Sequence, residues 1–137
     1  MPEDDKESMP DQYKTVSLEE FVEYSKSMFA YWTEDDFASS FRKMLTIEQF
    51  RSEEMQGLYQ QYLSSGPAAY VKDLFESMGI AHAEGNAVRF YATMYFYYSV
   101  YDGADDKEKV KNEFASTIGS MAQEWIKQPK LTQIRKS

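Results

Sequence analysis

The stretch Ala87-Val88-Arg89-Phe90-Tyr91-Ala92-Thr93-Met94-Tyr95-Phe96-Tyr97-Tyr98-Ser99-Val100-Tyr101 is the most apolar part of the chain. Seven of its fifteen residues are aromatic, and Arg89 is its only charged residue. Drawn as a helix it is apolar on every side, and such a helix is buried on every side. We predict a helix over 87–101 with Asn86 as its N-cap. A domain of this size cannot enclose it completely, so part of its surface is expected to meet another subunit.

Amphipathic patterns with capping signals flank this stretch on both sides. Ser17-Leu18-Glu19-Glu20 is a capping box, and Thr33-Glu34-Asp35-Asp36 repeats a helix-start signal. Ser64-Ser65-Gly66-Pro67 reads as a break, with Pro67 in the first position of the next helix and Gly79 at its C-terminal cap. Since no strand pattern occurs, we predict an all-α domain of six helices. Besides 87–101, they cover 18–32, 34–49, 52–63, 67–78 and 106–126.

Composition bounds the function classes. The 137 residues include no Cys and one His, so a disulfide scaffold, a thiolate metal site and a multi-His metal site are excluded. The net charge of −8, from 15 Lys+Arg and 23 Asp+Glu, disfavours nucleic acid or an anionic membrane as the main partner. Neither a signal peptide nor a membrane-spanning run is visible, so we expect a cytoplasmic protein.

Three segments divide the chain. Residues 1–16 form an acidic leader without helical periodicity, which we expect to be disordered. Residues 17–126 form the helical domain. Residues 127–137 carry four basic residues and no acidic one, and we expect a mobile tail.

No catalytic constellation is visible, so we expect no enzyme and no cofactor. His82 lies close to Glu84 in a predicted loop, which admits a metal or acid–base role, but an exposed, solvated histidine is the more ordinary interpretation. It lacks the Glu three residues before it that an iron-binding helix pair uses. No glycine-rich phosphate loop and no nucleophile elbow occur.

The chain resembles the C-terminal regulatory domain of TetR-family transcriptional regulators. Phe41-Arg42-Lys43-Met44-Leu45-Thr46-Ile47-Glu48-Gln49-Phe50-Arg51 is similar to that family's leucine-rich helix end followed by Glu-x-Phe-Arg, and Ser52 through Tyr59 stands in place of its continuation. The aromatic helix, the Tyr101-Asp102-Gly103 turn and the 106–126 helix are similar to its closing helix pair. The likeness spans 17–126. Nothing matches the family's N-terminal helix-turn-helix, so we expect no specific DNA binding by this chain itself.

The resemblance implies an apolar cavity between the first four or five helices that binds a small molecule, lined by aromatic and apolar side chains with a few polar groups. Glu48 is either a surface residue, paired with Arg51 or Lys43, or an inward carboxylate that meets the ligand. The predicted ligand-binding residues are Trp32, Phe37, Phe41, Met44, Glu48, Tyr59, Tyr62, Phe75, Tyr91, Met94 and Tyr95.

The resemblance also implies that the last two helices form a four-helix dimer bundle. The 106–126 helix carries a stripe of large residues beside a stripe of small ones, more than one intramolecular neighbour needs, and Gly119 in its middle costs about 1 kcal/mol relative to Ala. The predicted homodimer interface is Phe96, Val100, Phe114, Ala115, Ile118, Gly119, Met121, Ala122 and Trp125.

Two hypotheses follow from different classes of protein. The favoured one is a regulatory domain that senses an apolar or aromatic small molecule and alters the spacing of DNA-binding modules. The alternative is a helical protein-interaction or adaptor module with a solid core and no ligand. An internal cavity distinguishes them, because it is ordinary in a sensor and out of place in a well-packed adaptor.

Overall fold

The computed structural model describes residues 17–127, and this part of the chain contains helices and no strand. The predicted acidic leader and nearly all of the predicted basic tail lie outside the described residues. The all-α prediction is confirmed, but the expected six separate helices are wrong: a single residue, Ser64, separates α5 from α6, and these two segments form one bent helix. The domain therefore has five helices, whose segments are α3 (Leu18–Glu34), α4 (Asp36–Glu48), α5 (Glu53–Leu63), α6 (Ser65–Ser77), α7 (Ala83–Gly103) and α8 (Lys107–Lys127).

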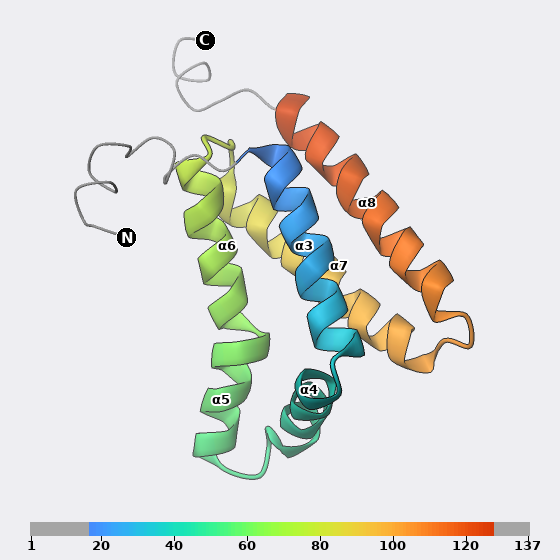
Figure 1. Cartoon of the computed structure of the whole chain (residues 1–137). Helices are drawn as coiled ribbons and strands as arrows, with labels where there is room; N and C mark the ends of the chain where they lie inside the picture. Colours follow the sequence, from blue (N-terminus) through green and yellow to red (C-terminus); the bar gives the residue numbers. More distant parts are fainter. Residues whose placement is uncertain (1–16, 128–137) are drawn as a thin grey trace, which may run out of the picture.

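The predicted capping box places the start of α3, whereas α4 begins two residues later than predicted. The Ser17 hydroxyl accepts from the Glu20 amide at 3.1 Å, and the Glu20 carboxylate accepts from the Ser17 amide at 3.0 Å. Helix α3 then runs two residues past the predicted end, and Asp35 caps α4 by accepting from the Ala38 amide at 2.9 Å. Only one residue links the two helices, so α4 turns sharply away from α3 (Figure 1).

The bend between α5 and α6 has its cause at Gly66. A Cβ on Gly66 would lie 2.2 Å from the Gln61 carbonyl oxygen, so only glycine lets the chain pass this close. Pro67 is the third residue of α6 rather than the first, which corrects the prediction. Because the amides of the first helical turn have no partner inside the helix, a proline there interrupts no hydrogen bond and the helix continues.

Helix α7 begins four residues earlier than predicted. Its N-cap is His82, in the left-handed region at φ 53°, and Gly79 also has a positive φ where α6 ends. Asn86 lies inside α7 and is not its N-cap. Its buried side chain donates to the Ala81 carbonyl at 2.8 Å, so the amide that would suit a cap holds the preceding turn instead.

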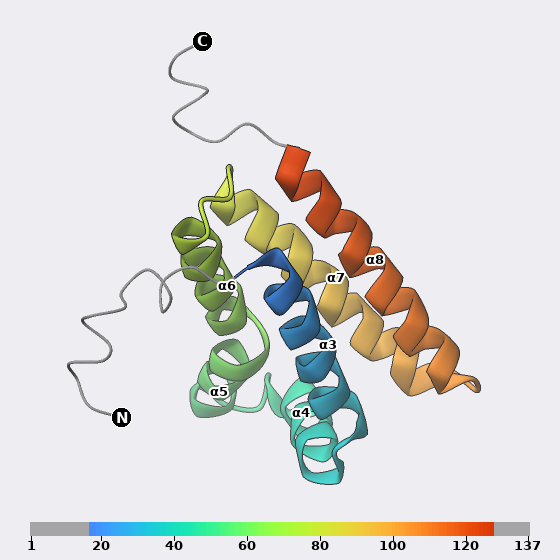
Figure 2. The same cartoon turned by 45° about the horizontal axis from the view of Figure 1, so that its top comes forward.

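Helix α7 forms the back of the domain, with α6, α3 and α8 arranged across it in that order (Figures 1 and 2). Aromatic contacts fill the space between them: Phe29 of α3 stacks on Phe114 of α8 with ring centres 4.3 Å apart, and Phe75 of α6 meets Trp125 of α8 at 4.7 Å. Phe21 of α3 lies among these helices and is 1% exposed. A smaller cluster of Leu45, Tyr59 and Leu63 joins α4 to α5.

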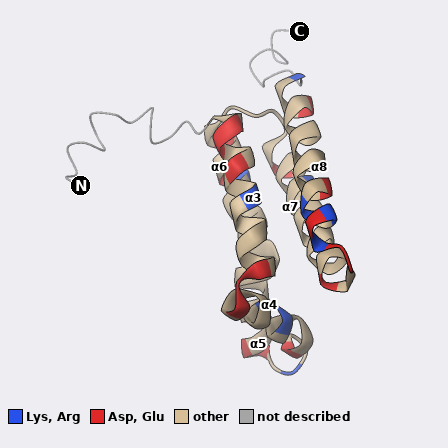
Figure 3. Cartoon of the chain, turned by 45° about the vertical axis from the view of Figure 1, so that its right-hand side comes forward, with Lys and Arg blue, Asp and Glu red and all other residues tan. Residues whose placement is uncertain are grey.

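Charged residues of both signs gather at the start of α8 and in the turn before it (Figure 3). Lys111 of α8 there forms an ion pair with Glu34 of α3 at 2.8 Å. Asp106 caps α8 by accepting from the Lys109 amide at 3.1 Å, so α8 begins at Lys107, one residue later than predicted. None of the helices in residues 17–127 is long and apolar enough to cross a membrane.

Candidate functional site

A pocket of about 260 Å³ lies between α3 and the bent α5–α6 helix, over α7. The bend at Gly66 shapes one wall, because Gly66 and Pro67 both line it. Helix α3 supplies the opposite wall with side chains three or four residues apart, the spacing that places them on one helix face. The side chains that line it are Phe21, Tyr24, Ser25, Met28 and Trp32 of α3, Gln61 and Tyr62 of α5, Tyr70 and Val71 of α6, and Phe90, Tyr91, Met94 and Tyr98 of α7.

Four of the predicted ligand-binding residues come together in this pocket: Trp32, Tyr62, Tyr91 and Met94. They lie on three different helices and up to 62 positions apart in the chain, so the fold itself assembles them. Tyr91 and Met94 are buried at its base, whereas Tyr62 is partly exposed.

The other predicted ligand-binding residues lie elsewhere. Phe37 and Met44 are on the exposed side of α4, and Phe41 stacks on Phe37 with ring centres 5.9 Å apart. Glu48 is paired with Arg51, as its surface interpretation expected. Phe75 is fully buried among the core aromatics, and the hydroxyls of Tyr59 and Tyr95 hydrogen-bond to each other outside the pocket.

Tyrosine hydroxyls supply most of the polar groups around the pocket. The Tyr91 hydroxyl donates to the Leu63 carbonyl, where the helix bends, and the Ser25 hydroxyl donates to the Phe21 carbonyl at 2.8 Å. Burial raises the pKa of Tyr91 and of Tyr98 far above the ordinary value. Burial also raises the pKa of Tyr24, with a further rise from its neighbour Tyr70. These hydroxyls are therefore neutral at pH 7.

Arg42 of α4 lies next to the pocket and was not singled out from the sequence. Its guanidinium makes two hydrogen bonds to the Asp102 carboxylate, at 3.0 and 2.8 Å, and its Nε donates to the Trp32 carbonyl at 3.0 Å. It also lies over the Tyr98 ring, 5.0 Å from the centroid. Arg42 thus joins α3, α4 and the end of α7. Arg42 and Asp102 are 60 positions apart, and no local pattern marks a pair at that separation.

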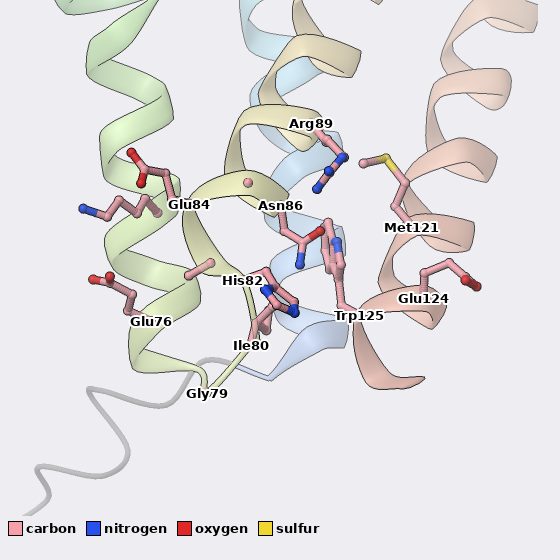
Figure 4. Close-up of a pocket in the computed structure, with 13 residues that line it drawn as sticks. Glu76, Gly79, Ile80, His82, Glu84, Asn86, Arg89, Met121, Glu124 and Trp125 are labelled. Carbon is pink, nitrogen blue, oxygen red and sulfur yellow. The ribbon is translucent and has the colours of Figure 1, made fainter. Parts of the chain in front are cut away.

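A second, larger hollow of about 1360 Å³ lies at the α6–α7 turn and the end of α8 (Figure 4). Its lining includes residues of both charge signs, among them Glu76, Arg89 and Glu124, together with His82. Within residues 17–127, no group of three or more His, Asp or Glu side chains could hold a metal ion. The hollow offers no converging catalytic groups, so the apolar pocket is the better candidate for a ligand.

The predicted dimer residues are divided by the fold. Phe114, Ile118, Ala122 and Trp125 pack inside the chain. Ala115 and Gly119 follow Lys111 at helical spacing, on the side of α8 whose lysine pairs with α3. Val100 and Met121 are half-buried against the core. Phe96 of α7 is 61% exposed, and it is the member of the set that lies on an open apolar surface.

Comparisons of the chain with protein-family models, with curated proteins and with solved structures find no match.

Proposed function

We propose that this domain binds an apolar or aromatic small molecule in the pocket between α3, α5–α6 and α7, and acts as a sensing and regulatory domain of the TetR-like type. The observation that carries the proposal is the pocket itself. Four of the predicted ligand-binding residues line it, and none of its fifteen lining residues has an ionised side chain. Ligand sites are concave and mostly apolar, with few polar groups.

The position of the pocket supplies a means of signalling. Residues of both α3 and α6 line it, and Arg42 connects the part of the pocket at Trp32 and Tyr98 to α4 and to the end of α7. A ligand that fits better when α3 and α6 stand at one particular separation favours that arrangement, by its difference in affinity for the two. The shift is then carried to α4, whose orientation depends on the one-residue link and on Arg42.

A second copy of the chain is part of the same proposal. Val88, Ala92, Phe96 and Ser99 form one exposed strip on α7, which we call the α7 strip. The α7 strip is one wall of a hollow of about 560 Å³, which is lined without an ionised side chain. In a two-fold dimer, Phe96 of each copy could enter the hollow of the other.

One observation favours the alternative, a protein-interaction module. Phe37, Ile47 and Phe50 at the α4 end of the domain are 73%, 74% and 84% exposed, and exposed apolar groups of this kind occur at protein contacts. The two functions differ in whether a small molecule stabilises the fold.

A panel of apolar and aromatic small molecules tests the proposal by thermal unfolding. A compound at about 100 times its Kd adds about 2.7 kcal/mol to the free energy of unfolding, which raises Tm by about 10 °C. Met28→Trp fills the pocket from α3 and is expected to abolish the rise. Met44→Trp places the same side chain on the outer side of α4 and is expected to keep it. If no compound raises the Tm of the wild type, the sensing function is wrong.

A further inference from the structure

The pocket is lined by rings and by no ionised group. Eight of its fifteen lining residues are aromatic, and none is Asp, Glu, Lys, Arg or His. From this lining we infer the class of ligand: a weakly hydrated organic monocation, such as an aryl or alkyl quaternary ammonium. The inference rests on the function proposed for the same pocket and adds the charge of the molecule that it takes.

Four partly exposed rings form the mouth in two rows. Tyr24 and Trp32 lie eight residues apart on α3, and Tyr62 and Tyr70 lie eight residues apart across the α5–α6 bend. At 1.5 Å per residue, the row on α3 is about 12 Å long. The face of an aromatic ring carries negative partial charge, so rings on both sides of a slot attract a cation between them.

Tyrosine rings of this domain already accept cations. The Arg42 guanidinium lies 5.0 Å from the centre of the Tyr98 ring, and Tyr98 lines the pocket. Because Arg42 is paired through two hydrogen bonds with Asp102, its charge is balanced locally and does not exclude a second cation nearby. One turn further along α7, the Lys107 ammonium lies 4.8 Å from the centre of the Tyr101 ring.

Charge also decides among the possible ligands. The chain carries a net charge of −8, and its field raises the local concentration of cations and lowers that of anions. A compact, strongly hydrated ammonium needs a carboxylate to replace its water, and the lining has none. A quaternary ammonium spreads its charge over methyl groups and makes no such demand.

Two molecules of the same shape test the inference: phenyltrimethylammonium and tert-butylbenzene, which differ in the central nitrogen or carbon and hence in charge. Water solvates the cation and rejects the hydrocarbon, so a merely apolar pocket would favour tert-butylbenzene. We expect phenyltrimethylammonium to bind at least as tightly to the full chain. Affinity is measured by titration, and the indole N–H signal of Trp32 in a 15N spectrum reports that the pocket is the site.

Substitutions at Tyr62 separate the ring from its hydroxyl. Tyr62 is 40% exposed, so its replacement leaves the core intact. Tyr62→Leu is expected to weaken phenyltrimethylammonium about two- to five-fold, the effect of one exposed cation–π contact, and Tyr62→Phe to leave it unchanged. The affinity for tert-butylbenzene should fall less in Tyr62→Leu than the affinity for phenyltrimethylammonium does, and it should not change in Tyr62→Phe.

The outcomes are distinct. If tert-butylbenzene binds more tightly than phenyltrimethylammonium, or if Tyr62→Leu weakens both equally, the ligand class is wrong while the pocket remains a binding site. If neither molecule moves the Trp32 signal and no compound of the panel raises Tm, the proposed function fails and the ligand class fails with it.

Discussion

Arg42 of α4 contacts residues of two other helices, α3 and α7. Its side chain is 7% exposed, and it holds Asp102, the Trp32 carbonyl and the Tyr98 ring at once. Arg42→Met leaves the Asp102 carboxylate without its partner, and breaking a buried pair in this way costs about 3–5 kcal/mol. Since Asp102 is 27% exposed, water recovers part of this, and we expect a loss near the lower limit. Urea unfolding followed by circular dichroism measures it.

The control for this prediction removes both partners. In the double variant Arg42→Met/Asp102→Ala no unpaired carboxylate remains, so it should be more stable than Arg42→Met alone. A double variant that is no more stable than the single one would mean that the bond to Trp32 and the contact with Tyr98, rather than the ion pair, hold α4 in place.

Two glycines of the bent helix, Gly57 and Gly66, differ in the space available for a side chain. A Cβ at Gly66 would meet the Gln61 carbonyl at 2.2 Å, whereas a Cβ at Gly57 in α5 meets nothing within 4 Å. We expect Gly66→Ala to destabilise by about 1–3 kcal/mol through this overlap. Gly57→Ala is expected to stabilise by about 0.5–1 kcal/mol because alanine favours helix. Thermal unfolding of the two variants measures whether each substitution raises or lowers stability. Equal changes in stability for the two variants would refute the steric cause of the bend.

Helix α7 carries the tyrosines whose pKa values are raised most, Tyr91, Tyr95 and Tyr98. Burial, together with the Tyr59 hydrogen bond, raises the pKa of Tyr95 from its ordinary 10 to about 12. The unfolded chain therefore loses this proton first, so the contribution is complete below pH 10 and is lost as the pH rises from 10 to about 12. We expect stability in urea to fall across this window, and to fall less in Tyr95→Phe. Equal pH dependence in the two proteins would contradict the linkage.

Secondary structure was predictable where its signals are local. The capping box at Ser17 and the positive φ at Gly79 lie where the sequence predicts helix ends, whereas α4 begins two residues after its predicted start. The start of α7 was not predictable in this way, because its N-cap His82 makes no side-chain capping hydrogen bond and adopts a left-handed conformation that no capping signal in the sequence marks. The sequence predicts that the helix stops at residues 64–67, whereas the helix only bends there. The residue types that end a helix also occur where a helix bends.

At the scale of the whole molecule, the smaller part of the pocket was predictable: four of the eleven predicted ligand-binding residues line it. Composition and periodicity select aromatic residues on inner helix faces, and Trp32, Tyr62, Tyr91 and Met94 satisfy that rule. They do not fix how helices cross, so Phe37 and Met44 were included although α4 turns them outward. For the same reason, the large stripe of α8 suggested a second subunit, while α3 and α7 of the same chain cover it.

The last prediction concerns assembly through the α7 strip. Phe96 is 61% exposed, and the hollow that it lines has no ionised residue, so a second copy could bury both. A two-fold interface makes one substitution act twice, and Phe96→Glu would place two carboxylates in apolar surroundings. We expect about 32 kDa for the wild type at micromolar concentration, twice the chain's 16.0 kDa, and a monomer for Phe96→Glu in equilibrium sedimentation.

Gly119→Arg is the matched control for the face of contact. A Cβ at Gly119 meets nothing within 4 Å, so the folded chain accommodates a side chain there, and the variant should remain a dimer if α7 alone makes the contact. Dissociation by Gly119→Arg with an intact Phe96→Glu dimer would move the interface to the small residues of α8. That outcome would also explain why α8 has a glycine in its middle, where no contact within residues 17–127 requires one. A wild-type monomer would refute the assembly on either face.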